Sequence, residues 1–145
     1  MDTAPQSQAK PAIDTAGMRL LHTMLRVRDL DRSVDFYTRL MGMRLLRKRE
    51  VPDGRYTIVF VGYGEDDAHT VLELTYNWDQ KEPYAIGSGF GHLAIAAPDL
   101  YKTCDALAKE GVKIPRPPGP LKFGTTHIAF AEDPDGYRIE LIQRA

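Results

Sequence analysis

The sequence predicts an α+β fold in which two tandem βαβββ modules form open, curved mixed sheets. The order strand, helix and three strands is present twice along the chain, and both copies begin with the same spacing. From His22 an Asp-Leu pair lies seven residues on, at Asp29, and from His92 the same pair lies seven residues on, at Asp99. This internal duplication predicts two equivalent structural units.

The first copy begins with an apolar stretch, LLHTMLRV at 20–27, which is typical of a strand. Asp29 is a good N-cap, and the helix after it is expected to end at Gly42, because glycine readily adopts the left-handed backbone that stops a helix. The apolar residues of this helix fall at helical spacing: Leu30, Val34, Tyr37 and Met41. Three β-rich stretches follow, at 43–51, 56–63 and 70–77.

The second copy repeats this order from a strand at 91–97, GHLAIAA. Asp99 is the expected N-cap and Gly111 the expected stop of its helix, whose apolar stripe consists of Leu100, Cys104 and Leu107. Three more strands are predicted, at 112–117, 126–132 and 137–143. The breaks agree with turn chemistry, because VPDG at 51–54 and DPDG at 133–136 carry Pro, Asp and Gly in the order that a type I turn favours.

Length and composition limit the classes of protein that this chain can form. Its 145 residues and 16.3 kDa fit one domain at 18–145, made of modules 18–81 and 88–145, after a flexible tail at 1–17. A net charge of -1 provides no basic field for nucleic acid, and no apolar run reaches the roughly 20 residues of a membrane span, so neither partner is expected. The single cysteine, Cys104, suits a reducing compartment, and a cytoplasmic location is therefore expected.

Strand alternation assigns side chains to faces, because residues two apart share a face. His22, Met24 and Arg26 share one face of the first strand, and burying this polar face unpaired against the helix would be costly. The same rule places four residues of the fourth strand together: Val71, Glu73, Thr75 and Asn77. The second module has the matching sets His92, Ala94, Ala96 and Arg138, Glu140, Ile142. The polar faces are therefore expected to line a cavity that a second sheet closes, within one chain or across a dimer.

Each module thus contributes one histidine and one glutamate, His22 with Glu73 and His92 with Glu140. Two imidazoles and two carboxylates that converge in a cavity form a plausible site for one divalent metal with positions open for water or substrate. Nitrogen and oxygen donors suit nickel, cobalt, iron, manganese or zinc and do not distinguish among them. Taken singly, each residue is more often a solvated or hydrogen-bonded side chain, and the duplication strengthens the case for the metal site.

Other polar and apolar residues are expected to have structural roles. His69 and His127 have no counterpart in the other module and are interpreted as surface or structural residues. Spacing places several apolar side chains in the core: Met24, Phe36, Tyr37 and Phe60.

Several long segments resemble a known family. They are MRLLHTMLRVRDLDRSVDFYTRLMGMRLLR, FVGYG followed by LELTYNW, GFGHLAIA with its PDL, and FAEDPDGYRIELI. From about Met18 to the C-terminus the chain is similar to glyoxalase I, the lactoylglutathione lyases of the vicinal oxygen chelate superfamily, and most of all to the short bacterial type. The family implies an enzyme that isomerises the hemithioacetal of methylglyoxal and glutathione to S-lactoylglutathione through an enediolate.

The resemblance also implies roles for individual residues. It implies a homodimer in which His22 and Glu73 of one chain meet His92 and Glu140 of the other around a metal at the subunit interface. Glu140 matches the catalytic base, with Glu73 as its symmetry-related alternative, and both are also ligands. Arg26 and Asn77 match positions that hold glutathione, and His92 is a further candidate for substrate contact.

Two departures from the longer relatives affect cofactor and thiol. Ser88 stands where the longer eukaryotic members have an arginine that helps to hold glutathione, so the thiol clamp is expected to be weaker or built differently. The inserted segments of the longer enzymes are missing, which by resemblance favours nickel or cobalt over zinc. From the residues alone, a surface ion pair with a neighbouring aspartate is the simpler interpretation of Arg26.

The superfamily leaves other activities open. An epimerase acting on a coenzyme A thioester also moves a proton beside a carbonyl and is the nearest enzymatic alternative. A ring-cleaving dioxygenase is less suitable, because a second glutamate ligand occupies a position that oxygen chemistry needs. A metal-free small-molecule binding protein of the same fold is the alternative from a different class.

Overall fold

The predicted βαβββ order is present twice in the computed structural model, which describes residues 9–145. The first module consists of β1 (His22–Arg26), α1 (Leu30–Asp35), η1 (Phe36–Leu40), β2 (Arg44–Val51), η2 (Pro52–Gly54), β3 (Tyr56–Gly62) and β4 (Val71–Asn77). The second consists of β5 (Leu93–Ala97), α2 (Leu100–Lys109), β6 (Arg116–Pro120), β7 (His127–Glu132) and β8 (Arg138–Gln143). Of the predicted tail, residues 1–8 lie outside the described part, and residues 9–17 form no helix or strand.

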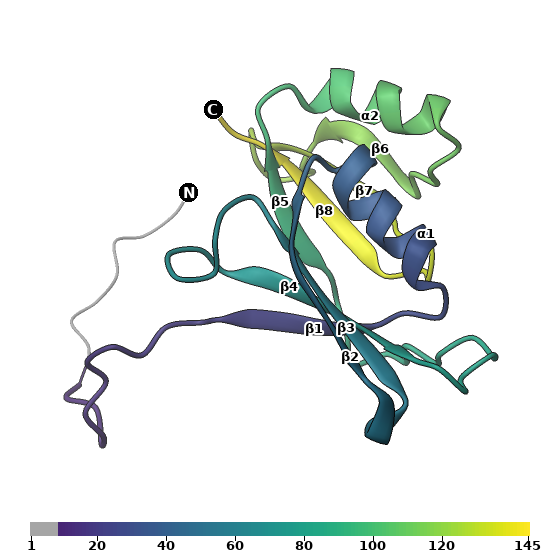
Figure 1. The fold of residues 1–145 in the computed structure, drawn as a ribbon. Helices are drawn as coiled ribbons and strands as arrows, with labels where there is room; N and C mark the ends of the chain where they lie inside the picture. Colours follow the sequence, from purple (N-terminus) through teal and green to yellow (C-terminus); the bar gives the residue numbers. More distant parts are fainter. Residues whose placement is uncertain (1–8) are drawn as a thin grey trace.

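Each module forms one four-stranded mixed sheet, with the order β1-β4-β3-β2 in sheet A and β5-β8-β7-β6 in sheet B. β1 runs parallel to β4, and β5 runs parallel to β8, whereas all other neighbouring strands are antiparallel. Figure 1 shows sheet A in the lower half of the view and sheet B with both helices above it. The α+β class and the open, paired-module architecture are confirmed.

The helices begin and end where local chemistry predicts. Asp29 caps α1 by accepting a hydrogen bond from the backbone N–H of Arg32 at 3.1 Å, and Asp99 caps α2 in the same way. The end of the first helix, η1, is wound more widely, because the N–H of Met41 donates five residues back to the carbonyl of Phe36. Gly42 then ends it with φ of 77°.

One hydrophobic core joins the two modules. The helix-facing sides of both sheets and the inner faces of both helices are buried in it. Its members include Leu25, Val27, Leu74, Ile139 and Leu141 from the sheets and Phe36, Tyr37, Leu100, Cys104 and Leu107 from the helices. Met24 is 36% exposed and Phe60 is half-buried, so their predicted core position is wrong. Both lie on the face of sheet A that points away from the helices.

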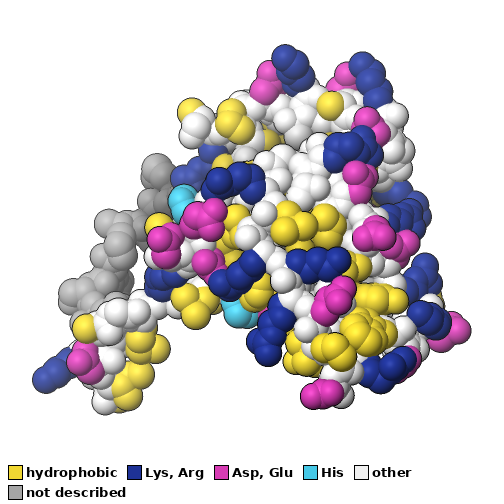
Figure 2. All heavy atoms as spheres, in the orientation of Figure 1, with side chains coloured by type: hydrophobic (Ala, Val, Ile, Leu, Met, Phe, Trp, Pro, Cys, Tyr) yellow, Lys and Arg dark blue, Asp and Glu magenta, His cyan; other side chains and the backbone are white. Residues whose placement is uncertain are grey.

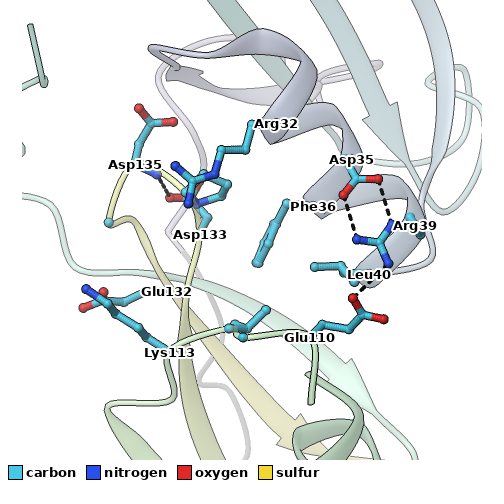
Figure 3. Close-up of a pocket in the computed structure, with 14 residues that line it drawn as sticks. Arg32, Asp35, Phe36, Arg39, Leu40, Glu110, Lys113, Glu132, Asp133 and Asp135 are labelled. Atoms are coloured by element: carbon cyan, nitrogen blue, oxygen red, sulfur yellow. Dashed lines mark hydrogen bonds and ion pairs between the residues drawn. The ribbon is translucent and has the colours of Figure 1, made fainter. Parts of the chain in front are cut away.

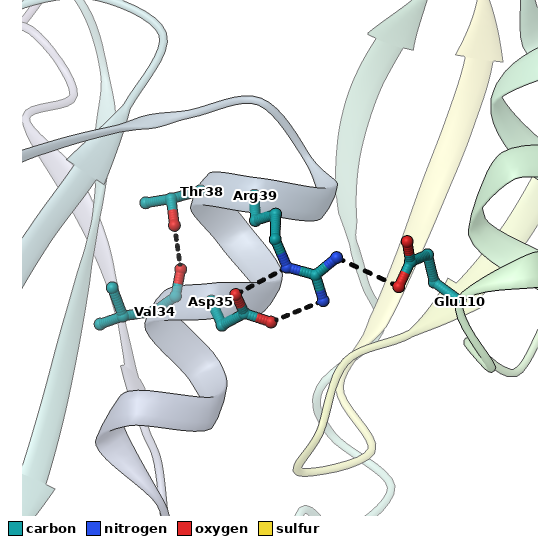
Figure 4. A network of polar contacts seen from close by, with 5 residues as sticks. All are labelled: Val34, Asp35, Thr38, Arg39 and Glu110. Carbon is teal, nitrogen blue, oxygen red and sulfur yellow. Dashed lines mark hydrogen bonds and ion pairs between the residues drawn. The ribbon is translucent and has the colours of Figure 1, made fainter.

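Hydrogen bonds from the DPDG turn hold the modules together. The turn is closed by the N–H of Gly136, which donates to the carbonyl of Asp133 at 3.0 Å. Asp133 accepts from the hydroxyl of Tyr37 at 2.7 Å, and the hydroxyl of Tyr137 donates to the carbonyl of Arg26 at 2.8 Å. A second link lies on the surface, where Arg39 of η1 binds both Asp35 and Glu110 (Figure 4).

The largest error of the strand prediction is at β6, which begins at Arg116 rather than at 112. Its prolines have no N–H to donate, so the strand is confined to the sheet edge, and its register is irregular between Arg116 and Gly119. The guanidinium of Arg116 compensates by donating to four nearby carbonyls, those of Pro117, Gly119, Pro120 and Ile128.

Two further findings concern the starts of the first strands and membrane-spanning helices. The first strands begin at His22 and Leu93, later than predicted, so His92 stands just before β5 rather than inside it. None of the helices in residues 9–145 is long and apolar enough to cross a membrane.

Candidate metal centre

His22 and Glu73 meet on the uncovered face of sheet A. The Nε2 atom of His22 lies 3.2 Å from Oε2 of Glu73. Parallel pairing of β1 with β4 places Met24 directly beside Glu73 and His22 two residues earlier on the same face. The imidazole is 38% exposed and the carboxylate 15% exposed, so both groups are open to a ligand on this face.

The second module repeats this arrangement on sheet B. The Nε2 atom of His92 lies 3.4 Å from Oε1 of Glu140, with side chains 42% and 18% exposed. Ala94 pairs with Glu140 where Met24 pairs with Glu73. The two histidine–glutamate pairs therefore occupy equivalent positions of the duplicated fold, as the alternation pattern predicts.

A phenylalanine supports each imidazole, and sequence reasoning missed both. Phe60 of β3 contacts His22 edge to face with ring centroids 5.5 Å apart, and Phe130 of β7 contacts His92 in the same way at 5.2 Å. Register places Phe60 beside Glu73 and Phe130 beside Glu140. The repeated Ile-x-Phe at 58–60 and 128–130 is the signal that would have found them.

The donor atoms of each pair have the separation that a shared metal requires. Two ligands bound at about 2.1 Å in tetrahedral or octahedral geometry lie about 3.0 to 3.4 Å apart. The observed 3.2 and 3.4 Å fall in this range, and imidazole with carboxylate suits first-row divalent metals. Across residues 9–145, however, no three metal-ligating side chains come together, and the two histidine–glutamate pairs, hereafter the candidate half-sites, lie on separate sheets.

Arg26 and Asn77 lie on the face of sheet A that carries the first pair. Arg26 is exposed at the end of β1 and shares the face of His22, and its side chain forms no ion pair with any described residue. The neighbouring-aspartate interpretation of Arg26 is therefore wrong. Asn77 is half-buried at the end of β4, and its Nδ2 donates to the hydroxyl of Tyr84 at 3.1 Å. Ser88 is exposed in the loop before β5.

The other two histidines lie apart from both pairs. His69 is exposed in the β3–β4 loop, and a side chain added at Gly64 would overlap its ring. His127 opens β7, and its Nδ1 lies 2.7 Å from the hydroxyl of Tyr101. Their interpretation as surface or structural residues stays a prediction.

A cavity of about 450 Å³ lies at the module junction (Figure 3). It is lined by α1 and η1, by the turn after α2 and by the DPDG turn, and it contains none of the predicted site residues. Three of its charged residues pair with one another, because Arg39 binds both Asp35 and Glu110, and the hydrogen bond from Arg39 lowers the pKa of Asp35. Burial raises the pKa of Asp133 to about 6, although hydrogen bonds from Tyr37 and two backbone N–H groups lower it.

Known proteins resemble this chain along most of its length. A family described as the Glyoxalase/Bleomycin resistance protein/Dioxygenase superfamily matches residues 19–141. A probable lactoylglutathione lyase of Synechocystis sp. is 56% identical over 87% of this chain and 95% of its own. The lactoylglutathione lyase of Escherichia coli O157:H7 is 52% identical over 87% of this chain and 93% of its own.

Solved structures agree with these relatives. Glyoxalase I of Leishmania major, described as trypanothione-dependent, superposes with a TM-score of 0.78 at 45% identity over 88% of this chain and 87% of its own. Glyoxalase I of Zea mays superposes with a TM-score of 0.84 at 54% identity, and this chain spans 45% of the maize chain. The chain belongs to the Glyoxalase/Bleomycin resistance protein/Dioxygenase superfamily and, within it, to the lactoylglutathione lyases, the glyoxalase I enzymes.

Proposed function

We propose that the chain isomerises the hemithioacetal of methylglyoxal and glutathione to S-lactoylglutathione, in a site with one divalent metal between two copies of the chain. The observation that carries this proposal is the presence of two equivalent histidine–glutamate pairs on two separate sheets, with nitrogen–oxygen separations of 3.2 and 3.4 Å. Membership of the lactoylglutathione lyases supports the choice of reaction.

A homodimer completes the site in this proposal. His22 and Glu73 of one protomer would face His92 and Glu140 of its partner, and twofold symmetry would produce two such sites. The uncovered face of sheet A supports this arrangement, because it exposes the apolar side chain of Met24 beside Glu73. Figure 2 shows exposed hydrophobic side chains between arginine and lysine side chains over the lower half of the molecule.

The reaction moves one proton from the carbon that bears sulfur to the adjacent carbon, and a second proton between the two oxygens. When bound, a divalent metal supplies Lewis-acid stabilisation of the negative charge that develops on those oxygens. Glu140 is the proposed base that takes the carbon-bound proton and delivers it to the neighbouring carbon. Coordination to a metal would lower the basicity of the Glu140 carboxylate, so Glu140 would act as the base only while it is not bound to the metal.

Glu73 occupies the equivalent position of the first module and is the proposed base for the opposite stereoisomer of the hemithioacetal. Arg26 is proposed to bind a carboxylate of glutathione through two parallel hydrogen bonds, since the planar guanidinium matches that geometry. The side-chain amide of Asn77 is proposed to donate and accept hydrogen bonds with a peptide group of glutathione. His92 is proposed to add a contact at the end of the hemithioacetal that carries the reacting carbons.

Nickel or cobalt is the proposed metal in preference to zinc, by resemblance to the short bacterial enzymes. Reduced glutathione is abundant where thiols stay reduced, and Cys104 is the only cysteine of the chain. We therefore place the enzyme in the cytoplasm.

Metal reconstitution tests the reaction and the metal class together. The protein is stripped with chelator and reloaded with nickel, cobalt or zinc, and thioester formation from methylglyoxal and glutathione is followed by absorbance. Activity restored by nickel or cobalt supports the full proposal, and activity restored mainly by zinc keeps the reaction and overturns the metal class. Failure with every metal rejects glutathione as the thiol, and trypanothione, the thiol of the Leishmania relative, is then the next substrate to assay.

Subunit mixing tests the shared site. His22→Ala and His92→Ala are each expected to be inactive, because each removes a ligand from both sites of its homodimer. After random exchange of subunits, half of the dimers carry one intact site, so about a quarter of wild-type activity should return. A site formed within one chain would recover no activity on mixing.

A further inference from the structure

The register of sheet A arranges side chains of the uncovered face in two rows across the strands. The inner row consists of Met24, Glu73, Phe60 and Arg47. The outer row, two residues along each strand, consists of Arg26, Thr75, Ile58 and Arg49. The outer row therefore has one arginine at each end, about 14 Å apart at the Cα atoms across three strand spacings.

Sheet B repeats the inner row but not the outer one. Its inner row consists of Ala94, Glu140, Phe130 and Arg116, which keeps the glutamate, the phenylalanine and the edge arginine. Its outer row consists of Ala96, Ile142, Ile128 and Gly119. The duplicated fold thus repeats the row that carries the glutamate, whereas only sheet A has cations in the outer row.

Arg49 differs from the other arginines of β2 and β6 in having no partner. Arg47 lies 2.6 Å from Asp66 and covers the Phe60 ring at 4.2 Å, and Arg116 is bound by backbone carbonyls. The guanidinium of Arg49 is exposed, and it forms neither a hydrogen bond nor an ion pair within residues 9–145. It stands beside Ile58, on the face that carries the His22–Glu73 pair.

We propose that Arg49 binds a carboxylate of the bound hemithioacetal, at the end of the outer row opposite Arg26. This inference rests on the proposed function, which places the reacting carbons beside Glu73. Glutathione carries two carboxylates, so the γ-glutamyl carboxylate can bind at Arg26 and the glycine carboxylate at Arg49. An anionic side group of the 2-oxoaldehyde is the other source of the same chemistry, because the aldehyde end extends away from the sulfur.

Matched substrates and variants test this role. Arg49→Ala and Arg49→Lys are compared with wild type and with Lys48→Ala, which removes an exposed cation from the opposite face of the same strand. The first substrate pair is the methylglyoxal hemithioacetal of glutathione and that of its glycine ethyl ester. The second pair is the glutathione hemithioacetal of phenylglyoxal and that of 4-carboxyphenylglyoxal.

Arg49→Ala should lower kcat/KM about ten-fold or more for the substrate that carries the recognised carboxylate and leave its uncharged counterpart nearly unchanged. Arg49→Lys should recover part of this loss, and Lys48→Ala should have no selective effect. A selective loss in the first pair assigns the glycine carboxylate, and one in the second pair assigns the aldehyde group. Equal effects of Arg49→Ala on both members of both pairs would overturn the inference, whereas an inactive wild type would overturn the proposed function and this inference with it.

Discussion

The hydroxyl of Tyr37 donates a 2.7 Å hydrogen bond to Asp133, and both side chains are buried where the two modules meet. Asp133 also accepts hydrogen bonds from the backbone N–H groups of Asp135 and Tyr137, each at 2.9 Å. Burial nevertheless dominates, and it raises the pKa of Asp133 from 3.8 to about 6. The carboxylate at the module junction is therefore costly to ionise near neutral pH.

Stability should depend on pH through Asp133. Because its folded pKa lies above its unfolded value, the folded state holds this proton more tightly between about pH 4 and 6. Its contribution to stability is fully present below pH 4 and is lost as pH rises through 6. The free energy of unfolding of wild type minus that of Asp133→Asn should fall by about 2 to 3 kcal/mol from pH 4 to 7. Denaturant titrations at one protein concentration measure this difference, and parallel pH profiles of the two proteins would contradict it.

Tyr37→Phe should destabilise the protein by about 1 to 3 kcal/mol, because it leaves a buried oxygen of Asp133 without its side-chain donor. The same change should raise the pKa of Asp133 further, since the bond from Tyr37 lowers it. Tyr101→Phe is the matched control, because its hydroxyl contacts His127 at the surface and its loss should cost well under 1 kcal/mol. Equal destabilisation by the two substitutions would show that the buried Tyr37–Asp133 hydrogen bond stabilises the protein no more than the surface contact of Tyr101 does.

The sequence predicted the structure best where a short repeat in the chain determines which side chains share a face. The two-residue repeat of a strand placed His22 on the face of Glu73, and His92 on the face of Glu140, with no knowledge of the sheet. The duplication then gave the topology of both modules. These features are local, or are repeated in the chain, and can therefore be predicted from the sequence.

Errors arose where tertiary packing determined the outcome. Phe60 is a large hydrophobic residue of the kind that is usually buried in a core, and only the arrangement of the sheets shows that its face is uncovered. The start of β6 depends on how the Arg116 side chain replaces missing backbone donors, which no periodicity describes. The junction of Tyr37 with Asp133 joins residues 96 positions apart, which no local pattern describes.

Phe60→Ala should weaken metal binding by roughly ten-fold, because it removes the ring that fixes the orientation of the His22 imidazole. Competition with a chromogenic chelator measures the dissociation constant. Phe123→Ala is the matched control, since that ring is 91% exposed and lies outside the half-sites. Unchanged metal affinity in Phe60→Ala would mean that the strand alone positions His22.

Cys104 should resist thiol reagents in the folded protein. The side chain is 3% exposed in the core, and burial raises its pKa, so little thiolate is available or accessible at pH 8. Reaction with a chromogenic disulfide should therefore follow unfolding by denaturant. Ala106→Cys on the exposed face of α2 provides a control thiol that should react at once. Rapid modification of Cys104 in the native protein would show that the core opens locally near α2.

Glu140→Gln should lower kcat by a factor of about 10² to 10⁴ at saturating metal, because the amide cannot accept the proton that the reaction moves. The change is nearly isosteric, so dimer formation, measured by light scattering, should persist. Metal content has to be measured in the same sample, since Glu140 is also a proposed ligand. His127→Ala, which loses only its contact with the Tyr101 hydroxyl, should keep most of the activity. Near-normal turnover in Glu140→Gln together with a large loss in Glu73→Gln would transfer the base to the first module, and a large loss in His127→Ala would mean that the reacting cavity extends to β7 beyond the two half-sites.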